Sequence, residues 1–257
     1  MIKAIFFDID GTLLSYKTHR MLPSTIEAFQ ILKQRGVTVF ISSGRPKVLF
    51  PKFPVEFDGY ISVNGGYCTV GDKVLVRNPL DRDACRRWLA FVEKHDLTTM
   101  CFTENRMFIN RIDPPSIALQ QQLGFEMPPV ASLSQLADEE VYQFIAMQPA
   151  EKDQEATLAM GKCRMPRWHP AFTDIIPDNS SKAVGIETII NHLGISREET
   201  MAFGDGGNDI EMLEYAAVGV AMGNAAENVK AHADYVTDSC EDDGIMNALL
   251  HFGVIEN

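Results

Sequence analysis

The stretch IKAIFFDIDGTLL occupies residues 2–14 and decides how the fold begins. Its first part, residues 2–7, is mostly apolar and rich in β-forming residues, as expected of a strand buried on both faces of a parallel sheet. Two aspartates, Asp8 and Asp10, follow directly, and Gly11 supplies the turn that leaves the strand. In open α/β sheets ligands bind beyond the carboxyl ends of the strands, which is where both carboxylates fall.

The pair Asp8 and Asp10 suits nucleophilic or acid–base chemistry. Repulsion between two carboxylates at one small site lets one remain ionised while the other holds a proton more readily. One aspartate could then be a nucleophile or metal ligand, and the other a general acid or base. The alternative is an acidic turn that caps the next segment, which is common for Asp-Gly, although a turn needs only one aspartate.

The outer parts of the chain alternate between short apolar strands and helices. After Pro23, apolar residues recur at helical spacing until Gly36, and residues 37–41 are again rich in β-branched side chains. The same rhythm returns later, where we expect helices at 180–193 and 209–217 and strands at 200–203 and 218–221. Short strand–helix–strand connections are typical of a parallel sheet, so we predict an α/β fold.

Residues 83–173 have a different character. Proline pairs interrupt this stretch at 114–115 and 128–129. The elements expected here are a helix at 86–93 and short alternating strands near 98–102, 107–110 and 141–147. This composition indicates an α+β domain at 83–173 that is inserted into a discontinuous α/β core formed by residues 1–82 and 174–257.

A second polar motif, GDGGND at residues 204–209, also follows an apolar strand. Its glycines permit a close approach of the backbone, and Asp205, Asn208 and Asp209 carry the hard oxygen ligands that suit Mg²⁺. A dinucleotide-binding G-x-G-x-x-G loop does not fit, because Asp209 stands at the last glycine position, and the Gly-Lys-Ser/Thr end of a Walker A loop is missing. The remaining alternative is a plain turn with Asp209 as the N-cap of a helix.

Two weaker signals indicate anion binding. The segment Ser42-Ser43-Gly44-Arg45 offers a hydroxyl and backbone N–H groups at the end of a strand, which can form a small anion site, with a simple turn as the alternative. Lys182 opens a helix, where a cation opposes the helix dipole. This local conflict suggests a functional reason for the lysine, against the alternative of a solvated surface residue.

Together these segments resemble the haloacid dehalogenase-like (HAD) phosphatase superfamily, especially its Cof-type branch with a type IIB cap. The resemblance spans nearly the whole chain and rests on the helix with Lys182 and on the segments FFDIDGTLL, ISSGRP, SVNGG, GDGGNDIEML, GVAMGNA and VKAHADYVTDSCEDDGI. It implies a Rossmann-like HAD core with a parallel sheet, and an α+β (type IIB) cap domain inserted between the second and third motifs.

The resemblance also implies a role for each matching residue. Asp8 would be the nucleophile that forms an aspartyl-phosphate, and Asp10 would protonate the leaving alkoxide and then activate water. Mg²⁺ would bind the Asp8 carboxylate, the Asp10 main-chain carbonyl and Asp205, with Asp209 in support. The residues that would hold the transferring phosphoryl oxygens are Ser43, Gly44, Lys182 and Asn208. The family more often has threonine where Ser43 stands, and serine keeps the hydroxyl.

The implied substrate is a small phosphorylated metabolite, foremost a sugar phosphate, recognised largely by the cap. The candidates for substrate specificity are Arg45, Asn64, Trp168, His169 and Asp174, with Arg164 close to the last three in sequence. The alternative is that Trp168 belongs to the cap core and its neighbours to the surface. Two other functions stay open: a phosphotransferase or phosphosugar mutase of the same fold, and a non-catalytic metabolite-sensing protein.

Charge and cysteine content limit the partners. The 257 residues carry a formal net charge of −12, and residues 175–257 alone hold 15 Asp or Glu against 3 Lys or Arg. This disfavours nucleic-acid binding, which needs an excess of basic side chains, so attraction of a phosphate ester must be local.

Five cysteines without a C-x-x-C pair favour a reducing compartment. We expect a cytoplasmic protein without a membrane or nucleic-acid partner, and a monomer, with a weak homodimer as the alternative.

Overall fold

The computed structural model covers residues 1–257 and describes all of them except 124, 137–138, 168 and 257. Contacts divide the chain into two compact units: residues 1–45, 51–77 and 181–257 form the core unit, and residues 46–50 and 78–180 form the insert unit. The sequence placed the divisions at 82/83 and 173/174. In the structure both positions lie inside the insert unit, because helix α2 begins at Arg82 and strand β10 runs from Thr173 to Pro177.

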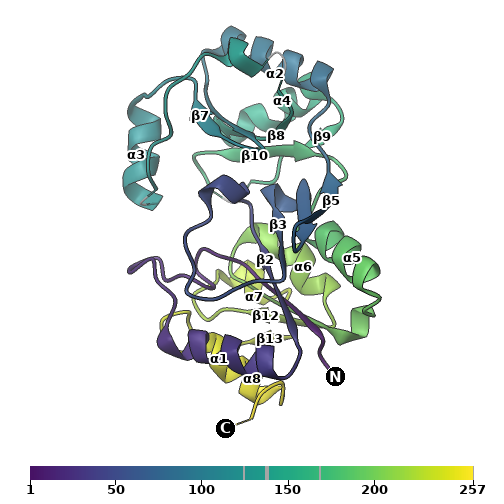
Figure 1. The fold of residues 1–257 in the computed structure, drawn as a ribbon. Helices are drawn as coiled ribbons and strands as arrows, with labels where there is room; N and C mark the ends of the chain where they lie inside the picture. The colour runs from purple at the N-terminus through teal and green to yellow at the C-terminus, as the bar shows by residue number, and fades with distance from the viewer. Residues whose placement is uncertain (124, 137–138, 168, 257) are drawn as a thin grey trace. The chain divides into compact units, whose positions relative to one another are not determined.

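An eight-stranded sheet forms the centre of the core unit, which Figure 1 shows as a ribbon. The strand order is β13-β12-β11-β1-β2-β3-β4-β5. The strands from β13 to β3 are parallel, and β4 and β5 continue the sheet in antiparallel pairing. The strands are β1 (Ala4–Phe7), β2 (Thr38–Ser42), β3 (Gly59–Ser62), β4 (Tyr67–Val70), β5 (Lys73–Arg77), β11 (Thr200–Gly204), β12 (Val218–Ala221) and β13 (Tyr235–Val236). The helices are α1 (Pro23–Gln34), α5 (Lys182–Leu193), α6 (Ile210–Tyr215), α7 (Glu227–Lys230) and α8 (Gly244–His251).

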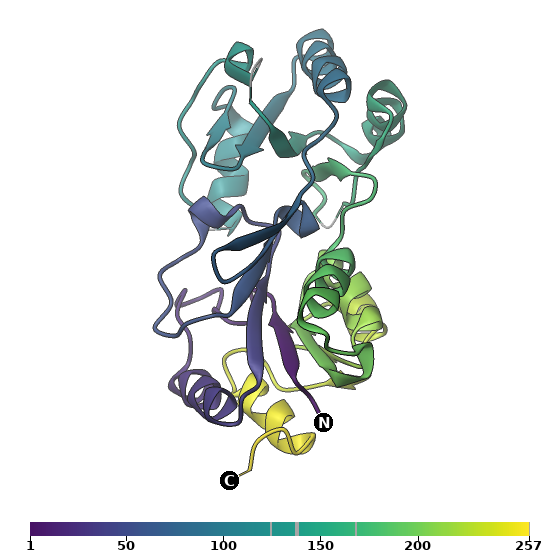
Figure 2. The same cartoon turned by 45° about the vertical axis from the view of Figure 1, so that its right-hand side comes forward.

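Strand β1 is buried on both faces, as its apolar sequence predicts. Phe6 stacks on Phe40 at a centroid distance of 5.1 Å and packs into a cluster that includes Ile189 of α5. The neighbouring Phe7 points to the other face and contacts Phe29 of α1 at 4.9 Å. Helices α5 and α6 therefore cover one face of the sheet and α1 and α8 the other (Figures 1 and 2). This two-sided cover leaves the carboxyl ends of the parallel strands for the polar loops.

The insert unit is built on a five-stranded antiparallel sheet in the order β7-β6-β8-β10-β9. Its strands are β6 (Thr98–Thr103), β7 (Met107–Ile109), β8 (Val141–Met147), β9 (Cys163–Arg164) and β10 (Thr173–Pro177). Its helices are α2 (Arg82–His95), α3 (Pro114–Leu123) and α4 (Asp153–Met160). Helix α2 starts earlier than the predicted residue 86, because the Asp81 carboxylate accepts hydrogen bonds from the N–H groups of Asp83 and Ala84 and so caps the first turn.

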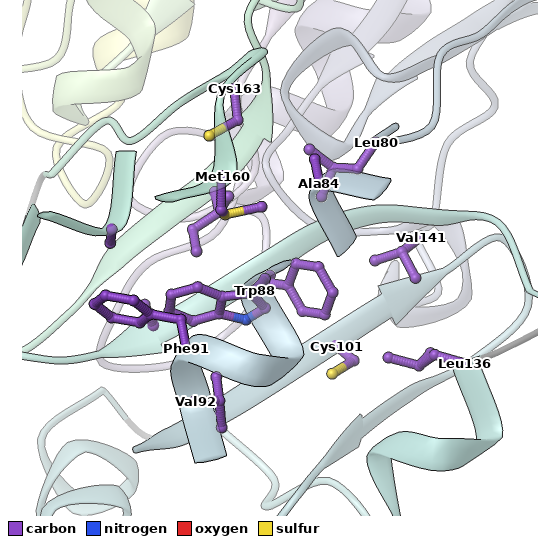
Figure 3. Packing of buried hydrophobic residues seen from close by; sticks show 14 of the residues in the cluster. Leu80, Ala84, Trp88, Phe91, Val92, Cys101, Leu136, Val141, Met160 and Cys163 are labelled. Atoms are coloured by element: carbon purple, nitrogen blue, oxygen red, sulfur yellow. The ribbon is translucent and has the colours of Figure 1, made fainter. Parts of the chain in front are cut away.

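Trp88 is at the centre of the hydrophobic core of the insert unit (Figure 3). It is fully buried, its ring lies 5.6 Å from that of Phe91 and 6.1 Å from that of Phe144 on β8, and its Nε1 donates to Thr99 Oγ1 at 3.3 Å. This unit thus has its own core, which fixes α2 against its sheet. Across the described part of the chain, no helix has the length and apolar character needed to cross a membrane.

Candidate active site

Asp8 and Asp10 lie on the loop that directly follows β1. Asp8 is buried, and the chain turns away at Gly11, whose φ is +82°. A Cβ atom at Gly11 would lie 2.2 Å from Asp205 Oδ2. Glycine is therefore required here both for the left-handed backbone and for the close approach of this loop to the loop that follows β11.

Three buried carboxylates gather where β1 and β11 end. Asp8, Asp205 and Asp209 each offer an oxygen within 4.8 Å of the others. The two strands pair in parallel with Phe7 opposite Phe203, so the residues that follow them emerge side by side although they are far apart in the sequence. This is a set of hard oxygen donors of the kind that Mg²⁺ binds, and it includes three of the four predicted metal ligands, Asp8, Asp205 and Asp209.

The Asp205 carboxylate is oriented by three side chains. Thr12 Oγ1 donates to its Oδ1 at 3.1 Å, and Tyr16 Oη and Asn224 Nδ2 approach its Oδ2 at 3.2 and 3.3 Å. Burial, reinforced by the negative charges of Asp8 and Asp209, raises the pKa of Asp205 to about 8. A bound cation would relieve this desolvation and repulsion, so the chemistry of the cluster fits a divalent metal.

Lys182 joins two of these carboxylates. The side chain is fully buried, and its Nζ donates to Asp8 Oδ1 at 2.6 Å and to Asp209 Oδ1. Burial alone would lower the pKa of Lys182, but Asp209 and Asp8 raise it above its ordinary value, so the ammonium stays charged. Burial raises the pKa of Asp8, while Lys182 opposes that change. The alternative of a solvated surface lysine is therefore wrong.

Asp209 stabilises the loop that follows β11 through hydrogen bonds to its backbone. Its Oδ2 accepts hydrogen bonds from the N–H groups of Asp205 at 2.9 Å and Gly206 at 2.8 Å, while its Oδ1 faces Lys182. The carboxylate thus reaches back into the loop and does not cap the following helix α6, as the N-cap alternative required. With both oxygens engaged in this way, Asp209 holds Lys182 and the loop in place.

The residues expected to hold a phosphoryl group converge on the same edge of the sheet. Ser43 and Gly44 follow β2, and Asn208 lies on the β11 loop, where its Nδ2 donates to Asn64 Oδ1 at 3.0 Å. A Cβ atom at Gly44 would come within 3.2 Å of Asn64 Oδ1 and 3.4 Å of Asn208 Nδ2. The loop after β2 is therefore in contact with the side chains of both asparagines.

Arg45, which the sequence assigned to substrate recognition, contacts Asp10. Its Nε and Nη2 donate to the two carboxylate oxygens of Asp10 at 2.6 and 2.7 Å. This is the bidentate geometry that a guanidinium makes with a carboxylate. Both side chains are partly exposed.

Comparisons with known proteins identify the family. The family model for haloacid dehalogenase-like hydrolases matches residues 5–249. The chain belongs to this family. The Bacillus subtilis protein YkrA is 34% identical over 99% of each chain, and the pyridoxal phosphate phosphatase YbhA of Escherichia coli is 31% identical over 95% of this chain and 96% of its own. The structure of BT4131, a sugar phosphatase of HAD subclass IIB, is 40% identical, has a TM-score of 0.90, and matches over 98% of this chain and 100% of that chain.

These similarities confirm the resemblance that the motifs carry. The protein is a HAD phosphatase with the α/β core and the inserted α+β domain of subclass IIB. The catalytic, metal-binding and phosphate-binding roles of its individual residues stay predictions.

The candidate specificity residues of this HAD phosphatase are divided between the units. Arg45 and Asn64 belong to the core unit, whereas His169 and Asp174 belong to the insert unit. His169 stacks on Phe172 with a centroid distance of 5.1 Å, and Asp174 is buried on β10. The prediction for Trp168 lies outside the described residues, and Arg164 is half-buried on β9.

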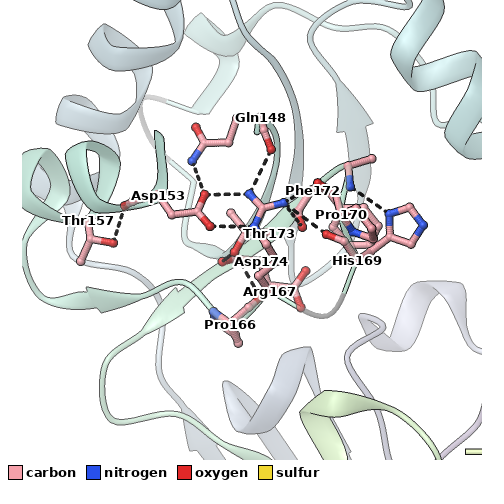
Figure 4. A network of polar contacts seen from close by, with 11 residues as sticks. Gln148, Asp153, Thr157, Pro166, Arg167, His169, Pro170, Phe172, Thr173 and Asp174 are labelled. Atoms are coloured by element: carbon pink, nitrogen blue, oxygen red, sulfur yellow. Dashed lines mark hydrogen bonds and ion pairs between the residues drawn. The ribbon is translucent and has the colours of Figure 1, made fainter. Parts of the chain in front are cut away.

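Arg167 organises the turn that carries His169, and the sequence analysis did not single it out. Its guanidinium makes two hydrogen bonds of 2.7 Å to the Asp153 carboxylate (Figure 4). It also donates to the backbone carbonyls of Gln148, His169, Pro170 and Phe172. No local pattern marks this arginine, because Asp153 lies on α4 and the carbonyls belong to irregular backbone.

Tyr16 and Asn224 were also missed in the core unit. Asn224 follows the end of β12, so the rule that ligands gather at the carboxyl ends of parallel strands could have found it. Its Nδ2 also donates to the Gly11 carbonyl at 2.8 Å, and its Oδ1 accepts from the N–H of Cys240 at 2.9 Å. Tyr16 lies in an irregular segment, and no sequence signal indicated its contact with Asp205.

Proposed function

We propose that this HAD phosphatase is a Mg²⁺-dependent phosphomonoester hydrolase that acts through an aspartyl-phosphate on Asp8. The observation that carries the proposal is the contact between Lys182 and Asp8 beside the buried carboxylates of Asp205 and Asp209. A carboxylate held by a buried lysine at the edge of a cation site is placed to attack phosphorus while positive charge stabilises the equatorial oxygens.

The proposed first step transfers the phosphoryl group to the protein. An Asp8 oxygen attacks phosphorus, the bond from phosphorus to the ester oxygen breaks, and Asp10 gives its proton to the leaving alkoxide. Lys182, the Ser43 hydroxyl, the Gly44 N–H and the Asn208 amide stabilise the negative charge on the phosphoryl oxygens. Mg²⁺, bound by Asp8, Asp205 and the Asp10 main-chain carbonyl, would supply the remaining neutralisation of charge.

The proposed second step releases phosphate. Asp10, now ionised, takes a proton from water, and the water oxygen attacks the phosphorus of the aspartyl-phosphate. The bond between phosphorus and the Asp8 oxygen breaks, which restores both aspartates for the next turnover. Arg45 orients the ionised Asp10 carboxylate through its bidentate contact, which suits the second step, and at least one of these hydrogen bonds must open for Asp10 to carry the proton of the first step.

We propose small phosphorylated metabolites as the substrates, with sugar phosphates first. BT4131 is named a sugar phosphatase and YbhA a pyridoxal phosphate phosphatase, so both similar proteins act on small phosphate esters. We propose that the insert unit is the cap that recognises the leaving group. His169 and Asp174 are our candidates for that recognition.

The decisive experiment is hydrolysis of p-nitrophenyl phosphate by the full chain with Mg²⁺ and with EDTA. We expect turnover only with Mg²⁺, none for Asp8→Asn, and little for Asp10→Asn. Turnover by Asp8→Asn would contradict the proposal that Asp8 is the nucleophile. Turnover in EDTA would contradict the proposed dependence on Mg²⁺. A screen of sugar phosphates with product analysis then separates a phosphatase, which gives free phosphate, from a mutase, which gives an isomerised sugar phosphate.

A further inference from the structure

The turn Val63–Gly65, directly after β3, has an uncommon backbone. Three successive residues adopt positive φ values: 45° at Val63, 52° at Asn64 and 90° at Gly65. A β-branched residue such as valine is disfavoured in this region, so the conformation must be imposed by the surrounding structure. Val63 and Asn64 are both buried, so the side chains and backbone packed around them can hold this conformation.

This turn is tied to the phosphate-binding loop after β2. The Asn64 N–H donates to the Ser43 carbonyl at 3.1 Å, and the Val63 N–H donates to the Arg45 carbonyl at 3.2 Å. These two bonds fix the backbone on either side of Gly44. The left-handed turn thus sets where the loop after β2 lies.

The same turn contacts the segments that carry Lys182 and Asn208. A Cβ atom at Gly65 would lie 2.1 Å from the carbonyl oxygen of Ser181, so the turn packs directly against the residue before Lys182. On its other side, Asn64 Oδ1 accepts a hydrogen bond of 3.0 Å from Asn208 Nδ2. One short turn therefore contacts all three segments that carry the expected phosphoryl-binding groups.

We infer that the turn Val63–Gly65 sets the mutual spacing of the phosphoryl-binding groups, and that Asn64 is a positioning residue that acts through Asn208. This inference rests on the proposed function, because it concerns the site at which the phosphoryl group is to bind. It gives Asn64 a different role from direct substrate recognition.

The chemistry of the amide explains how Asn64 acts. Asn208 Nδ2 carries two hydrogens, and the bond to Asn64 uses one of them and fixes the plane of the amide. The second hydrogen can then donate to a phosphoryl oxygen. Without the Asn64 oxygen, the Asn208 amide can turn over and present its own oxygen to the phosphate, which would repel it.

A double-mutant cycle tests the inference. The proteins are the wild type, Asn64→Gly, Asn208→Ala and the double variant, and the readouts are kcat/KM with p-nitrophenyl phosphate and the affinity for orthophosphate by calorimetry with Mg²⁺. We expect each single change to weaken both by about 10-fold, as for the loss of one hydrogen bond to a charged group, and the double variant by about 10-fold as well. An additive loss of about 100-fold would overturn the inference, because independent contacts add.

Glycine is chosen at position 64 because it keeps the left-handed backbone while removing the amide. A matched control is Asp96→Gly, since Asp96 is also left-handed (φ 50°) but is exposed in the insert unit, and we expect its kcat/KM to stay within about 2-fold of the wild type. If Asn64→Gly does not fold, Asn64→Ser replaces it, because serine also removes the amide that accepts from Asn208 Nδ2 and leaves the Gly44 N–H untouched. The decrease in kcat/KM and in orthophosphate affinity that this replacement variant causes must likewise vanish in the Asn208→Ala background. A decrease that persists there overturns the inference.

The two readouts separate this inference from the proposed function. Absence of turnover in the wild-type protein would count against the phosphatase mechanism. The cycle in orthophosphate affinity would still decide whether Asn64 acts through Asn208.

Discussion

Arg45 holds Asp10 by two hydrogen bonds of 2.6 and 2.7 Å, one to each carboxylate oxygen. The two residues stand on the loops after β2 and β1, so the contact links the loop of the proposed acid–base residue to the loop that we propose to bind phosphate. A planar guanidinium fixes both the position and the plane of a carboxylate, which a single ammonium group cannot do.

Arg45→Lys is expected to lower kcat for p-nitrophenyl phosphate about 5-fold, and Arg45→Ala about 50-fold, because an acid–base group that is displaced or rotates transfers its proton less efficiently. The measurement is steady-state kinetics at saturating Mg²⁺. Arg86→Ala is the matched control, since Arg86 pairs with Asp83 on the exposed face of α2. If Arg45→Ala changed KM alone, Arg45 would be a substrate-binding residue and not a support for Asp10.

Removing the Lys182 ammonium should affect both rate and stability. We expect Lys182→Met to lower kcat by about 10³-fold, as for the loss of a main stabilising group at the phosphoryl oxygens. In EDTA at pH 8 the free energy of unfolding should fall by about 3 kcal/mol, because Asp8 and Asp209 then stay buried without their cation. Urea unfolding measures this loss.

The loss of stability in Lys182→Met should be smaller at pH 5.5, where Asp8 can bind a proton and become neutral. Lys94→Met is the control, because the Lys94–Glu155 pair is exposed and its loss should change the free energy of unfolding by less than about 0.5 kcal/mol. Equal losses at the two pH values would show that burial of uncompensated charge is not the cause.

The raised pKa of Asp205 predicts an unusual pH dependence of the metal-free protein. The folded pKa of about 8 lies above the ordinary value of 3.8, so the folded state binds more protons than the unfolded state between these values. The stability contributed by this proton is present at low pH and is lost as the pH rises through about 8. In EDTA, the free energy of unfolding should therefore fall by about 2–3 kcal/mol from pH 5.5 to 7.5.

Mg²⁺ should reverse that dependence, because the metal displaces the proton. Its affinity, measured by calorimetry, should rise by up to about 10-fold per pH unit below pH 8. Asp205→Asn cannot take up this proton and should flatten the stability profile. A wild-type profile in EDTA that rises with pH would contradict the assignment of a raised pKa.

The sequence predicted the parts of the site that obey a local rule. Asp8 and Asp205 follow apolar strands directly, and because parallel strands end at one edge of a sheet, their meeting could be inferred without coordinates. The mild conflict of Lys182 with the helix dipole correctly marked a residue that is not on the surface. These residues can therefore be recognised from the sequence segments next to them.

Other contacts could not be predicted, since they depend on side chains that meet only in the folded chain. Tyr16 reaches Asp205 across 189 positions, and nothing in its own segment indicates a partner. The sequence could not show whether Arg45 binds Asp10 or the substrate, because an arginine near the site suits a carboxylate partner and a phosphate partner equally. Element boundaries also shifted where a cap decided them, as with Asp81 before α2.

The contact between Arg167 and Asp153 yields a prediction about the insert unit. The pair is largely buried, and the guanidinium also holds the carbonyls of the turn that carries His169 (Figure 4). Arg167→Lys keeps the charge but loses the bidentate geometry, so we expect the free energy of unfolding to fall by about 2 kcal/mol. For Arg167→Met we expect a fall of about 3–4 kcal/mol, because Asp153 keeps its hydrogen bond from Gln148 Nε2 but loses its positively charged partner.

The kinetic consequence should depend on the substrate. If the insert unit recognises the leaving group, Arg167→Lys should raise KM for a sugar phosphate several-fold and leave kcat for p-nitrophenyl phosphate within about 2-fold, because the aspartates and Lys182 belong to the core unit. Arg111→Lys is the control, since Arg111 binds Asp96 at an exposed position of the same unit. Equal losses for both substrates would mean that Arg167 supports the fold of the insert unit without shaping its recognition surface.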